Sequence, residues 1–496
     1  MALLSVSHLT FRYDGSDEPL FSDVSLQLDT SWRLGFVGRN GRGKTTFLRL
    51  LTGELTGRGT ISSPTAFEYF PYAVPDETQA TAAVLAGICP EAPDWALERE
   101  LRLLDLSTEL LGRPWATLSG GERTKALIAA MCLRENAFLL IDEPTNHLDA
   151  AGREKVSRYL AGKAGFILVS HDRAFLDGCV DHILALNRAG IELEAGNYSS
   201  WAYNRALRDQ HELDTDEKLR RDIRRLQASA RSAATWADRA ESRKIGLVPG
   251  KTEKSIGRRS WEGEKSRKMQ QRRKNLQRRT ERAIEEKAGL LQNLERTEEL
   301  KLSPLRHYAE RLIEARDLTL SYDGRAVCTV PRFELCQGQR IRLSGRNGCG
   351  KSSLLKLLTG TPIDHTGEIR TAPGLIFSVV PQDTSFLSGS LDAFIERAGV
   401  DGTQMRTILR KLDFDRALFD RDMGTYSAGQ KKKVLLARSL SERAHVYVWD
   451  EPLNYVDLFS REQLERLILD FAPTMLLVEH DAAFADAVAT DTLNLG

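Results

Sequence analysis

The sequence lacks the features that mark membrane and secreted proteins. No segment approaches the roughly 18 consecutive apolar residues that a membrane-spanning helix needs. Its apolar runs, such as Phe138–Ile141 and Phe166–Val169, instead have the length of buried strands. The N-terminus shows no charged region followed by an apolar core, so no secretion signal is visible. The six cysteines form no CxxC pair, which argues against a zinc site, an iron–sulfur site and a disulfide framework. These absences favour the reducing cytoplasm.

Net charge is nearly absent from the chain as a whole but not from one segment. The 496 residues carry a formal charge of +1, whereas the stretch from Arg239 to Arg282 holds 16 Lys and Arg against 5 Asp and Glu. This concentration predicts a polyanionic partner, because Lys and Arg that neutralise phosphates release condensed counterions. A solvated linker helix is the alternative interpretation. The length exceeds what one hydrophobic core supports, so we expect two or three domains.

A phosphate-binding loop follows an early apolar strand. The strand Leu34–Val37 leads into GRNGRGKT and then into an apolar helical run, which is the context that confirms a GxxxxGK(S/T) motif. Lys44 is expected to reach the β- and γ-phosphates of a nucleotide, and Thr45 to bind Mg²⁺. The predicted ATP-binding residues of this loop are Gly38, Arg39, Asn40, Gly41, Arg42, Gly43, Lys44, Thr45 and Thr46.

Groups suited to hydrolysis follow two later strands. Asp142 and Glu143 end the strand that contains Phe138–Ile141. We expect Asp142 to hold Mg²⁺ and Glu143 to act as the general base. His171 directly follows a second strand and can donate a hydrogen bond to a γ-phosphate.

A hydroxyl and two glycines precede a helix that we predict over Arg123–Leu133. The dipole and the free N–H groups at such a helix start attract anions. Alone, this triplet is more often a simple turn. Beside a phosphate loop it predicts four further ATP-binding residues, which are Ser119, Gly120, Gly121 and Glu122.

The whole series recurs in the second half of the chain, which indicates an internal repeat. Lys44 precedes Asp142 by 98 residues, and Lys351 precedes Asp450 by 99. Ser352 and Asp450 are the predicted Mg²⁺ ligands of the second copy, and Glu451 and His480 its catalytic pair. Its ATP-binding residues are Gly345, Arg346, Asn347, Gly348, Cys349, Gly350, Lys351, Ser352, Ser353, Ser427, Ala428, Gly429 and Gln430.

One tyrosine stands upstream of each phosphate loop in a shared sequence pattern. Tyr13 and Tyr322 can each stack on the face of an adenine, which is the use that we predict. The alternative is a tyrosine at the edge of a strand.

These motifs, in the same order twice, resemble those of the ATP-binding cassette (ABC) superfamily, a class of P-loop NTPases. The resemblance covers residues 1–200 and 312–496, which we expect to be two α/β ATPase domains. It implies that the two domains close head-to-tail on two ATP molecules. Each phosphate loop would then face the serine–glycine segment of the other domain.

Residues 201–311 between the two repeats read as a basic helical hairpin. Helices are predicted over Asp214–Glu241 and Trp261–Leu302, on either side of the breaker Gly246–Gly250. Arms of this length reach about 60 Å. The outer half suits structured RNA, whose phosphates and shape it would contact. The predicted RNA-binding residues are Lys244, Lys251, Lys254, Arg258, Arg259, Lys265, Arg267, Lys268, Arg272, Arg273, Lys274, Arg278 and Arg279.

Twin cassettes around such a hairpin resemble the ABC-F family of translation factors. The second half is similar to its antibiotic-resistance branch, notably at Tyr426–Val434 and Trp449–Tyr455. The resemblance implies binding to the bacterial 70S ribosome at the exit site in the ATP-bound form. It implies linker contacts with 23S rRNA and P-site tRNA, and displacement of lincosamide, pleuromutilin or streptogramin A drugs. No membrane permease and no DNA are expected as partners.

The sequence departs from the family pattern at a few positions. Ala428 replaces the counterpart of Gly120, so the two ATP sites are expected to differ in rate. Tyr72 stands where a Mg²⁺-contacting glutamine is expected, whereas Gln382 fills that role in the second half. The chain ends 16 residues after His480, and we expect no regulatory C-terminal extension.

Two other functions fit parts of this pattern. A housekeeping translation factor would bind the ribosome without a role in drug resistance. The ATPase subunit of a membrane permease would have no use for the basic hairpin. The sequence indicates no particular drug class.

Overall fold

The computed structural model describes residues 3–15, 19–187, 190–211, 300–322, 324–346 and 348–495, and ten single residues between 214 and 278. The chain divides into two compact units. One comprises Met1–Trp201 with Thr297–Gly496, and the other comprises Ala202–Arg296. Within the first unit, we call residues 3–201 the first lobe and residues 300–495 the second lobe.

The first lobe is built around a six-stranded sheet with the order β5-β6-β7-β3-β8-β9. Neighbouring strands are parallel, except that β9 runs antiparallel to β8. The central strands are buried on both faces, which explains their continuous apolar sequences. The strands are β3 (Arg33–Gly38), β5 (Ala66–Phe70), β6 (Ala137–Asp142), β7 (Phe166–Val169), β8 (His182–Leu186) and β9 (Ile191–Ala195).

A smaller antiparallel sheet packs against this one. Its order is β2-β1-β4, formed by β1 (Leu3–Phe11), β2 (Phe21–Asp29) and β4 (Arg58–Ser62). Leu4 of this sheet, Phe36 of the main sheet and Phe47 of the helix after the phosphate loop belong to one buried cluster. The phosphate loop is therefore anchored on both sides by the same core.

The second lobe repeats this plan. Its main sheet has the order β14-β15-β16-β12-β17 with all neighbours parallel, and its smaller sheet has the order β11-β10-β13. These orders match those of the first lobe without β9, which confirms the predicted internal repeat and the α/β class. The strands are β10 (Arg311–Tyr322), β11 (Arg325–Cys336), β12 (Arg340–Ser344), β13 (His365–Thr371), β14 (Phe377–Val380), β15 (Val446–Asp450), β16 (Met475–Val478) and β17 (Asp491–Asn494).

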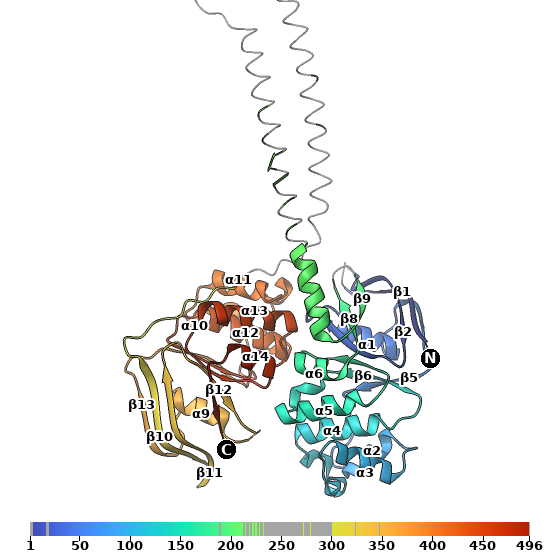
Figure 1. Cartoon of the computed structure of the whole chain (residues 1–496), viewed down its shortest axis with the longest axis horizontal. Helices are drawn as coiled ribbons and strands as arrows, with labels where there is room; N and C mark the ends of the chain where they lie inside the picture. The colour runs from blue at the N-terminus through green and yellow to red at the C-terminus, as the bar shows by residue number, and fades with distance from the viewer. Residues whose placement is uncertain are drawn as a thin grey trace, which may run out of the picture. The chain divides into compact units, whose positions relative to one another are not determined.

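Helices of the two lobes correspond in the same way (Figure 1). Those of the first lobe are α1 (Lys44–Thr52), α2 (Thr81–Ile88), α3 (Asp94–Leu103), α4 (Gly120–Met131), α5 (Ala150–Ala161) and α6 (Arg173–Cys179). Those of the second lobe are α9 (Lys351–Leu358), α10 (Leu391–Ala398), α11 (Gly402–Lys411), α12 (Ala428–Ser441), α13 (Leu458–Phe471) and α14 (Ala482–Val488). Helical residues 198–211 carry the chain out of the first lobe.

Two predicted helix boundaries are wrong. Helix α4 begins at Gly120 rather than Arg123, because Ser119 and Glu122 form a capping box that places both glycines in the first turn. The predicted helix Trp261–Leu302 cannot extend to Leu302, because residues 300–302 are not helical. Leu300 and Leu302 instead pack into the core of the second lobe.

Most of the predicted hairpin lies outside the described residues. This applies to nearly all of Asp214–Glu241 and Trp261–Leu302 and to the breaker between them. Among the predicted RNA-binding residues, Arg278 is described, and it is helical and exposed. In the part of the chain that the structure describes, no helix is both long and apolar enough to cross a membrane.

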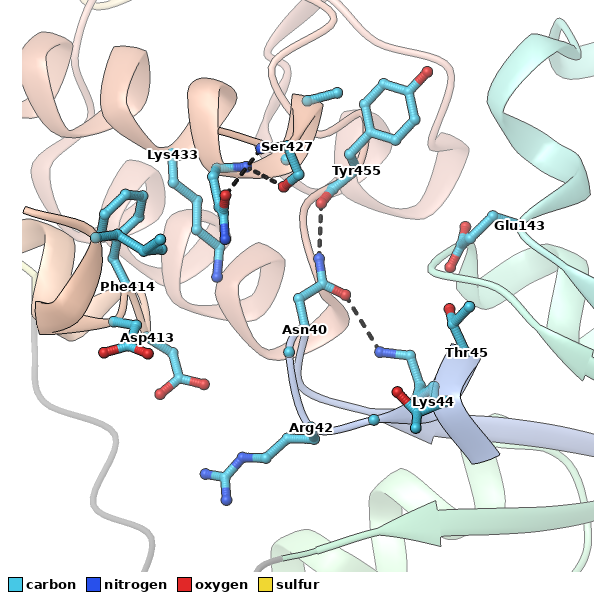
Figure 2. Close-up of a pocket in the computed structure, with 18 of the residues that line it drawn as sticks. Asn40, Arg42, Lys44, Thr45, Glu143, Asp413, Phe414, Ser427, Lys433 and Tyr455 are labelled. Atoms are coloured by element: carbon cyan, nitrogen blue, oxygen red, sulfur yellow. Dashed lines mark hydrogen bonds between the residues drawn. The ribbon is translucent and has the colours of Figure 1, made fainter. Parts of the chain in front are cut away.

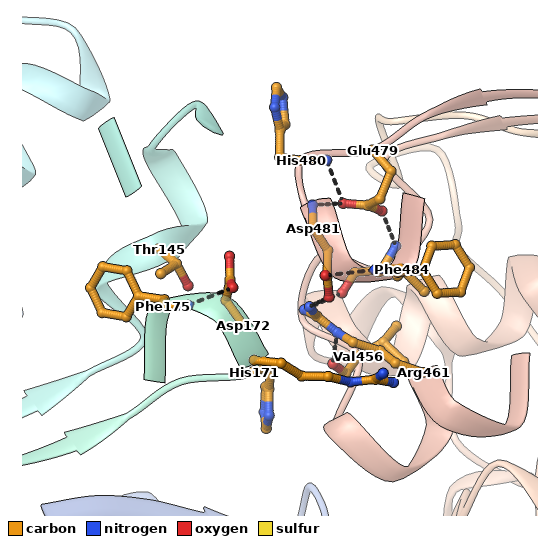
Figure 3. A network of polar contacts seen from close by, with 12 residues as sticks. Thr145, His171, Asp172, Phe175, Val456, Arg461, Glu479, His480, Asp481 and Phe484 are labelled. Carbon is orange, nitrogen blue, oxygen red and sulfur yellow. Dashed lines mark hydrogen bonds and ion pairs between the residues drawn. The ribbon is translucent and has the colours of Figure 1, made fainter. Parts of the chain in front are cut away.

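A buried arginine joins two functional loops in each lobe. In the second lobe, Arg461 Nη1 lies 2.8 Å from Asp481 Oδ2, and its other nitrogens donate to the carbonyls of Leu453 and Val456 (Figure 3). In the first lobe, Arg153 and Asp172 form the same pair at 3.0 Å. The pair fixes the loop after the paired carboxylates against the loop that carries the predicted histidine.

We expect Arg461→Met to destabilise the second lobe. The substitution leaves the fully buried Asp481 carboxylate without its cation, and removing one partner of a buried pair costs about 3–5 kcal/mol. Urea denaturation followed by circular dichroism should show an earlier transition. Arg158→Ala, which removes the exposed Glu154–Arg158 pair, is the matched control and should leave the midpoint unchanged. Equal midpoints for both variants would contradict the role of this clamp.

Candidate nucleotide sites

Two cavities lie between the lobes, and each receives residues from both. The first, of about 1000 Å³, lies between the phosphate loop of the first lobe and Ser427–Gln430 of the second. The other, of about 670 Å³, lies between the second phosphate loop and Ser119–Glu122. These volumes fit small-molecule and cofactor sites. We call the cavities site one and site two; their composition is the head-to-tail arrangement that the ABC resemblance implies.

The phosphate loops are held by glycine geometry and by their own lysines. Gly43 has φ +100°, and a Cβ there would meet Leu20 at 2.8 Å. Lys44 is buried and donates to the carbonyls of Gly38 and Arg39 at 2.7 and 3.2 Å. Burial lowers the pKa of its ammonium, although nearby carboxylates oppose this shift.

The second loop repeats this geometry. Lys351 donates to the carbonyls of Gly345 and Arg346 at 2.8 and 2.9 Å. Both loops therefore present their backbone N–H groups at a helix start beside a buried cation, which is the arrangement that binds phosphates.

The predicted Mg²⁺ ligands lie together in site one. Thr45 donates its hydroxyl to Asp142 Oδ2 at 2.7 Å, and Tyr69 donates to the same oxygen at 3.0 Å. In site two, Asp450 Oδ1 is buried and accepts no hydrogen bond among the described residues. Burial raises the pKa of Asp450. Hydroxyl and carboxylate oxygens are the donors that Mg²⁺ prefers, so both sets fit this ion.

Of the predicted catalytic pair of site one, His171 is buried and Glu143 is half-buried. Glu143 adopts φ +52° directly after β6. His171 Nε2 lies 3.2 Å from Glu143 Oε1 and 2.9 Å from Asn40 Oδ1. Burial, reinforced by the charge of Asp142, raises the pKa of Glu143 to about 8. Burial also lowers the pKa of His171 well below its usual value.

The counterpart in site two has a different environment. Glu451 Oε2 accepts hydrogen bonds from Gln382 Nε2 at 2.9 Å and from Asn454 Nδ2 at 2.7 Å. His480 Nε2 lies 3.4 Å from Glu451 Oε1. Burial opposes ionisation, but the hydrogen bonds from His480 and Gln382 outweigh it and hold the pKa of Glu451 below its ordinary value. Burial acts on both candidate bases, and hydrogen-bond donors offset it at Glu451.

The serine–glycine segments form the first turns of α4 and α12. Ser427 Oγ accepts from the N–H of Gln430 at 3.3 Å, and Gln430 Oε1 accepts from the N–H of Ser427 at 2.9 Å. Ser119 and Glu122 form the same capping box. Each serine hydroxyl keeps its proton for a further acceptor. Gly429 is required sterically, because a Cβ there would lie 2.7 Å from the carbonyl oxygen of Tyr455.

Direct contacts between the lobes gather beside site one (Figure 2). Asn40 Nδ2 donates to the carbonyl of Tyr455 at 2.8 Å. Arg39 lies 3.8 Å from Asp413 and 5.6 Å from the ring centroid of Phe459. The phosphate loop of the first lobe is thus attached to the second lobe at both Arg39 and Asn40.

Most predicted ATP-binding residues line one of the two cavities. In site one, the exceptions are Gly38 and Arg39, which do not line the cavity. Tyr13 does line it, and its hydroxyl lies 2.8 Å from Thr46 Oγ1. In site two, the predicted residues that do not line the cavity are Tyr322, Gly345, Arg346, Cys349 and Asp450. Asn347 lies outside the described residues.

Several residues of the sites escaped the sequence analysis. Tyr69, rather than Tyr72, reaches Asp142 in site one. Asn454 contacts Glu451, and its place three residues after that carboxylate could have indicated this. Lys433 lines site one and lies 3.1 Å from Asp457. Lys433 lies on α12, six residues after the capping Ser427, and this spacing could have indicated that it reaches the same site.

Comparison with known proteins agrees with this geometry. The family model described as ABC transporter matches residues 21–146 and 329–454. The ribosome protection protein VmlR of Bacillus subtilis is 27% identical, over 97% of this chain and 85% of its own length. The energy-dependent translational throttle protein EttA of Haemophilus influenzae is 26% identical, over 96% of this chain and 89% of its own length. Among solved structures, the archaeal ribosome recycling factor aABCE1 in complex with the stalk protein aP1 is similar in fold, with a TM-score of 0.65 and 20% sequence identity. The match covers 98% of this chain and 87% of aABCE1.

Two nucleotide-binding lobes with shared sites define a twin-cassette ATP hydrolase, and the chain belongs to the ATP-binding cassette family. The chain accordingly binds and hydrolyses ATP. The relatives confirm the resemblance to the ABC-F family.

We expect Glu143→Gln with Glu451→Gln to trap ATP. The glutamine keeps the shape of each side chain but removes the general base, which is worth about 10²–10⁴-fold in rate. Phosphate release should fall by this factor, while radiolabelled ATP stays bound through gel filtration. The two single variants measure how much of the hydrolysis rate each site contributes. Glu154→Gln, on the exposed face of α5, should hydrolyse ATP like the parent, and wild-type turnover by the double variant would exclude these carboxylates as bases.

Proposed function

We propose that this protein is an ATP-driven ribosome-binding factor that protects the ribosome from antibiotics. The observation that carries the proposal is the arrangement of residues from both lobes around each of two cavities, with a strongly basic segment between the lobes in sequence. A nucleotide held by both lobes stabilises their closed arrangement. Hydrolysis removes the γ-phosphate on which that closure depends.

The residues of each site have separate roles in this proposal. Lys44 and Lys351 hold the phosphates, and the serine–glycine segment of the opposite lobe contacts the γ-phosphate. Glu143 and Glu451 each take the proton of an attacking water. Thr45 and Asp142, with Ser352, Gln382 and Asp450 in site two, would hold Mg²⁺, which neutralises charge on the phosphates when bound.

In each site, one histidine and one tyrosine make the remaining contacts with the nucleotide. His171 and His480 donate to the γ-phosphate, and Tyr13 and Tyr322 stack on the adenines. The contact between Asn40 and the carbonyl of Tyr455 supports this reading for site one, because it brings a phosphate loop and the opposite lobe together.

The basic linker, residues 201–311, would bind ribosomal RNA. Between Arg239 and Arg282 the excess of positive charge is 11, while the rest of the chain is acidic. Phosphate contacts of this kind supply affinity and orientation without reading base sequence. Two relatives that match nearly all of this chain are named for ribosome protection and for translational control, which supports the ribosome as the source of that RNA.

A finer proposal concerns where on the ribosome the protein binds and what it does to bound drugs. The ATP-bound protein would occupy the exit site of the bacterial ribosome, with its linker toward the peptidyl-transferase region and P-site tRNA, and would displace drugs bound there. The name of VmlR supports a protective role. The name of EttA favours the second candidate, a translation factor without a drug role.

Ribosome binding should depend on trapped ATP. We expect Glu143→Gln with Glu451→Gln protein to cosediment with 70S ribosomes in ATP and to stay in the supernatant without nucleotide, because only the closed form presents the linker. Sucrose-cushion centrifugation measures this. Absence of the trapped protein from the ribosome pellet would remove the proposal.

The basic linker should supply the salt dependence of this binding. In the same background, replacing Arg272, Arg273, Arg278 and Arg279 by Gln removes four cations and should flatten the plot of log affinity against log salt by about 3. Gln at four arginines with exposed side chains is the matched control for the loss of positive charge elsewhere, namely at Arg102, Arg158, Arg332 and Arg370. An unchanged slope would exclude the linker as the phosphate contact.

A drug panel separates the two candidates. We expect expression of the wild-type protein, but not of Lys44→Ala with Lys351→Ala, to raise the inhibitory concentration of at least one lincosamide, pleuromutilin or streptogramin A drug. Both are tested in a sensitive bacterial strain, because displacement requires the ATP-bound form. Ribosome binding with no shift for any drug would favour the translation factor.

A further inference from the structure

One helix of the second lobe, α13, contacts the first lobe at its N-terminal end and again over its next turns. At the N-terminal end of α13, the carbonyl of Tyr455 accepts from Asn40 of the phosphate loop, and Phe459 lies under Arg39. Asp457 caps the helix by accepting from the N–H of Ser460 at 2.9 Å. The start of α13 is therefore fixed to site one.

Two glutamates on the next turns of α13 reach other parts of the first lobe. Glu465 Oε2 lies 2.9 Å from Arg173 Nη1, and Glu462 Oε1 accepts from the hydroxyl of Tyr198 at 3.0 Å. These glutamates are three residues apart and so share one face of the helix. We call the two pairs, Arg173–Glu465 and Tyr198–Glu462, the strut.

The first-lobe partners of the strut have informative positions. Arg173 is the first residue of α6, two residues after His171 of site one. Tyr198 is buried at the start of helical residues 198–211, where its ring packs 5.5 Å from that of Trp201. This helix carries the chain from the first lobe into the unit that begins at Ala202.

The strut exists on one side of the molecule only. In the repeat, Glu465 corresponds to Ser157 and Arg173 corresponds to Ala482, so the equivalent ion pair cannot form. Glu462 corresponds to Glu154, which pairs with Arg158 within its own exposed helix face. General requirements of the cassette fold would apply to both lobes. A contact present only beside the helix that leads to the linker points to a task connected with the linker.

We infer that the strut transmits closure at site one to helix 198–211, so that bound ATP fixes the direction in which the linker leaves the first lobe. ATP held by both lobes favours the arrangement in which α13 contacts Asn40. Because α13 is one rigid helix, the same arrangement sets Glu462 and Glu465 against Tyr198 and Arg173. The inference rests on the proposed function only for the identity of what the linker contacts.

Hydrogen exchange of the backbone amides in residues 198–211 tests the inference without ribosomes. The parent is the Glu143→Gln, Glu451→Gln protein, in which we expect ATP to slow exchange in this helix by about ten-fold. The strut variant adds Tyr198→Phe and Glu465→Ser, the latter introducing the residue found in the repeat. In the strut variant, we expect ATP to change the exchange rate of residues 198–211 by less than about two-fold, while the affinity for ATP stays unchanged. Glu154→Gln is the matched control and should behave like the parent.

Charge reversal distinguishes coupling from a general loss of stability. Arg173→Glu alone and Glu465→Arg alone should each abolish the ATP effect, and the two together should restore it, because the pair is reformed with opposite orientation. Equal slowing by ATP in the strut variant, no slowing in the parent, or no rescue by the double reversal would each overturn the inference. Failure of the parent to bind ribosomes would instead remove the proposed function and leave the exchange result standing.

Discussion

The structure depends on the fact that neither lobe contains a complete nucleotide site. The phosphate loop of the first lobe meets Ser427–Gln430 of the second, and the hydrogen bond from Asn40 to the carbonyl of Tyr455 joins the two at this point. A ligand shifts a conformational equilibrium only by its difference in affinity between the states. A nucleotide that touches both lobes has such a difference, because separating the lobes removes its contacts with one of them.

Repetition of the motifs does not make the two sites equal. Glu143 Oε1 lies 3.2 Å from His171 Nε2, and desolvation raises the pKa of Glu143 to about 8. Glu451 accepts hydrogen bonds from Gln382 and Asn454, and its pKa lies below the ordinary value. The same side chain after the same strand thus has two different environments, because hydrogen bonds from Gln382 and His480 offset burial at Glu451. Among the described residues, the contacts between the lobes at Arg39, Asn40 and the strut have no counterpart given above for site two.

The sequence was sufficient for the parts of the fold that depend on local patterns. Apolar runs located the central strands, and glycine spacing located both phosphate loops. The start of α4 was misplaced because two glycines look like a break, whereas the capping box of Ser119 and Glu122 holds both glycines in the first turn. Tyr69, Lys433 and Tyr455 were missed because their contacts depend on how strands and lobes are brought together. No local pattern reports a contact such as that of Asn40 with Tyr455, 415 residues away.

The distribution of charge adds a constraint on how this chain can meet RNA. The basic segment from Arg239 to Arg282 carries an excess of 11 positive charges in a chain whose total is +1, so the remainder is acidic. A polyanion therefore attracts one segment and, on average, repels the rest. At physiological ionic strength such forces act over about 8 Å. Close approach is then favourable only with the basic segment leading, which makes its direction of exit from the first lobe important for binding. The strut contacts Tyr198, at the start of the helix that leads toward this segment.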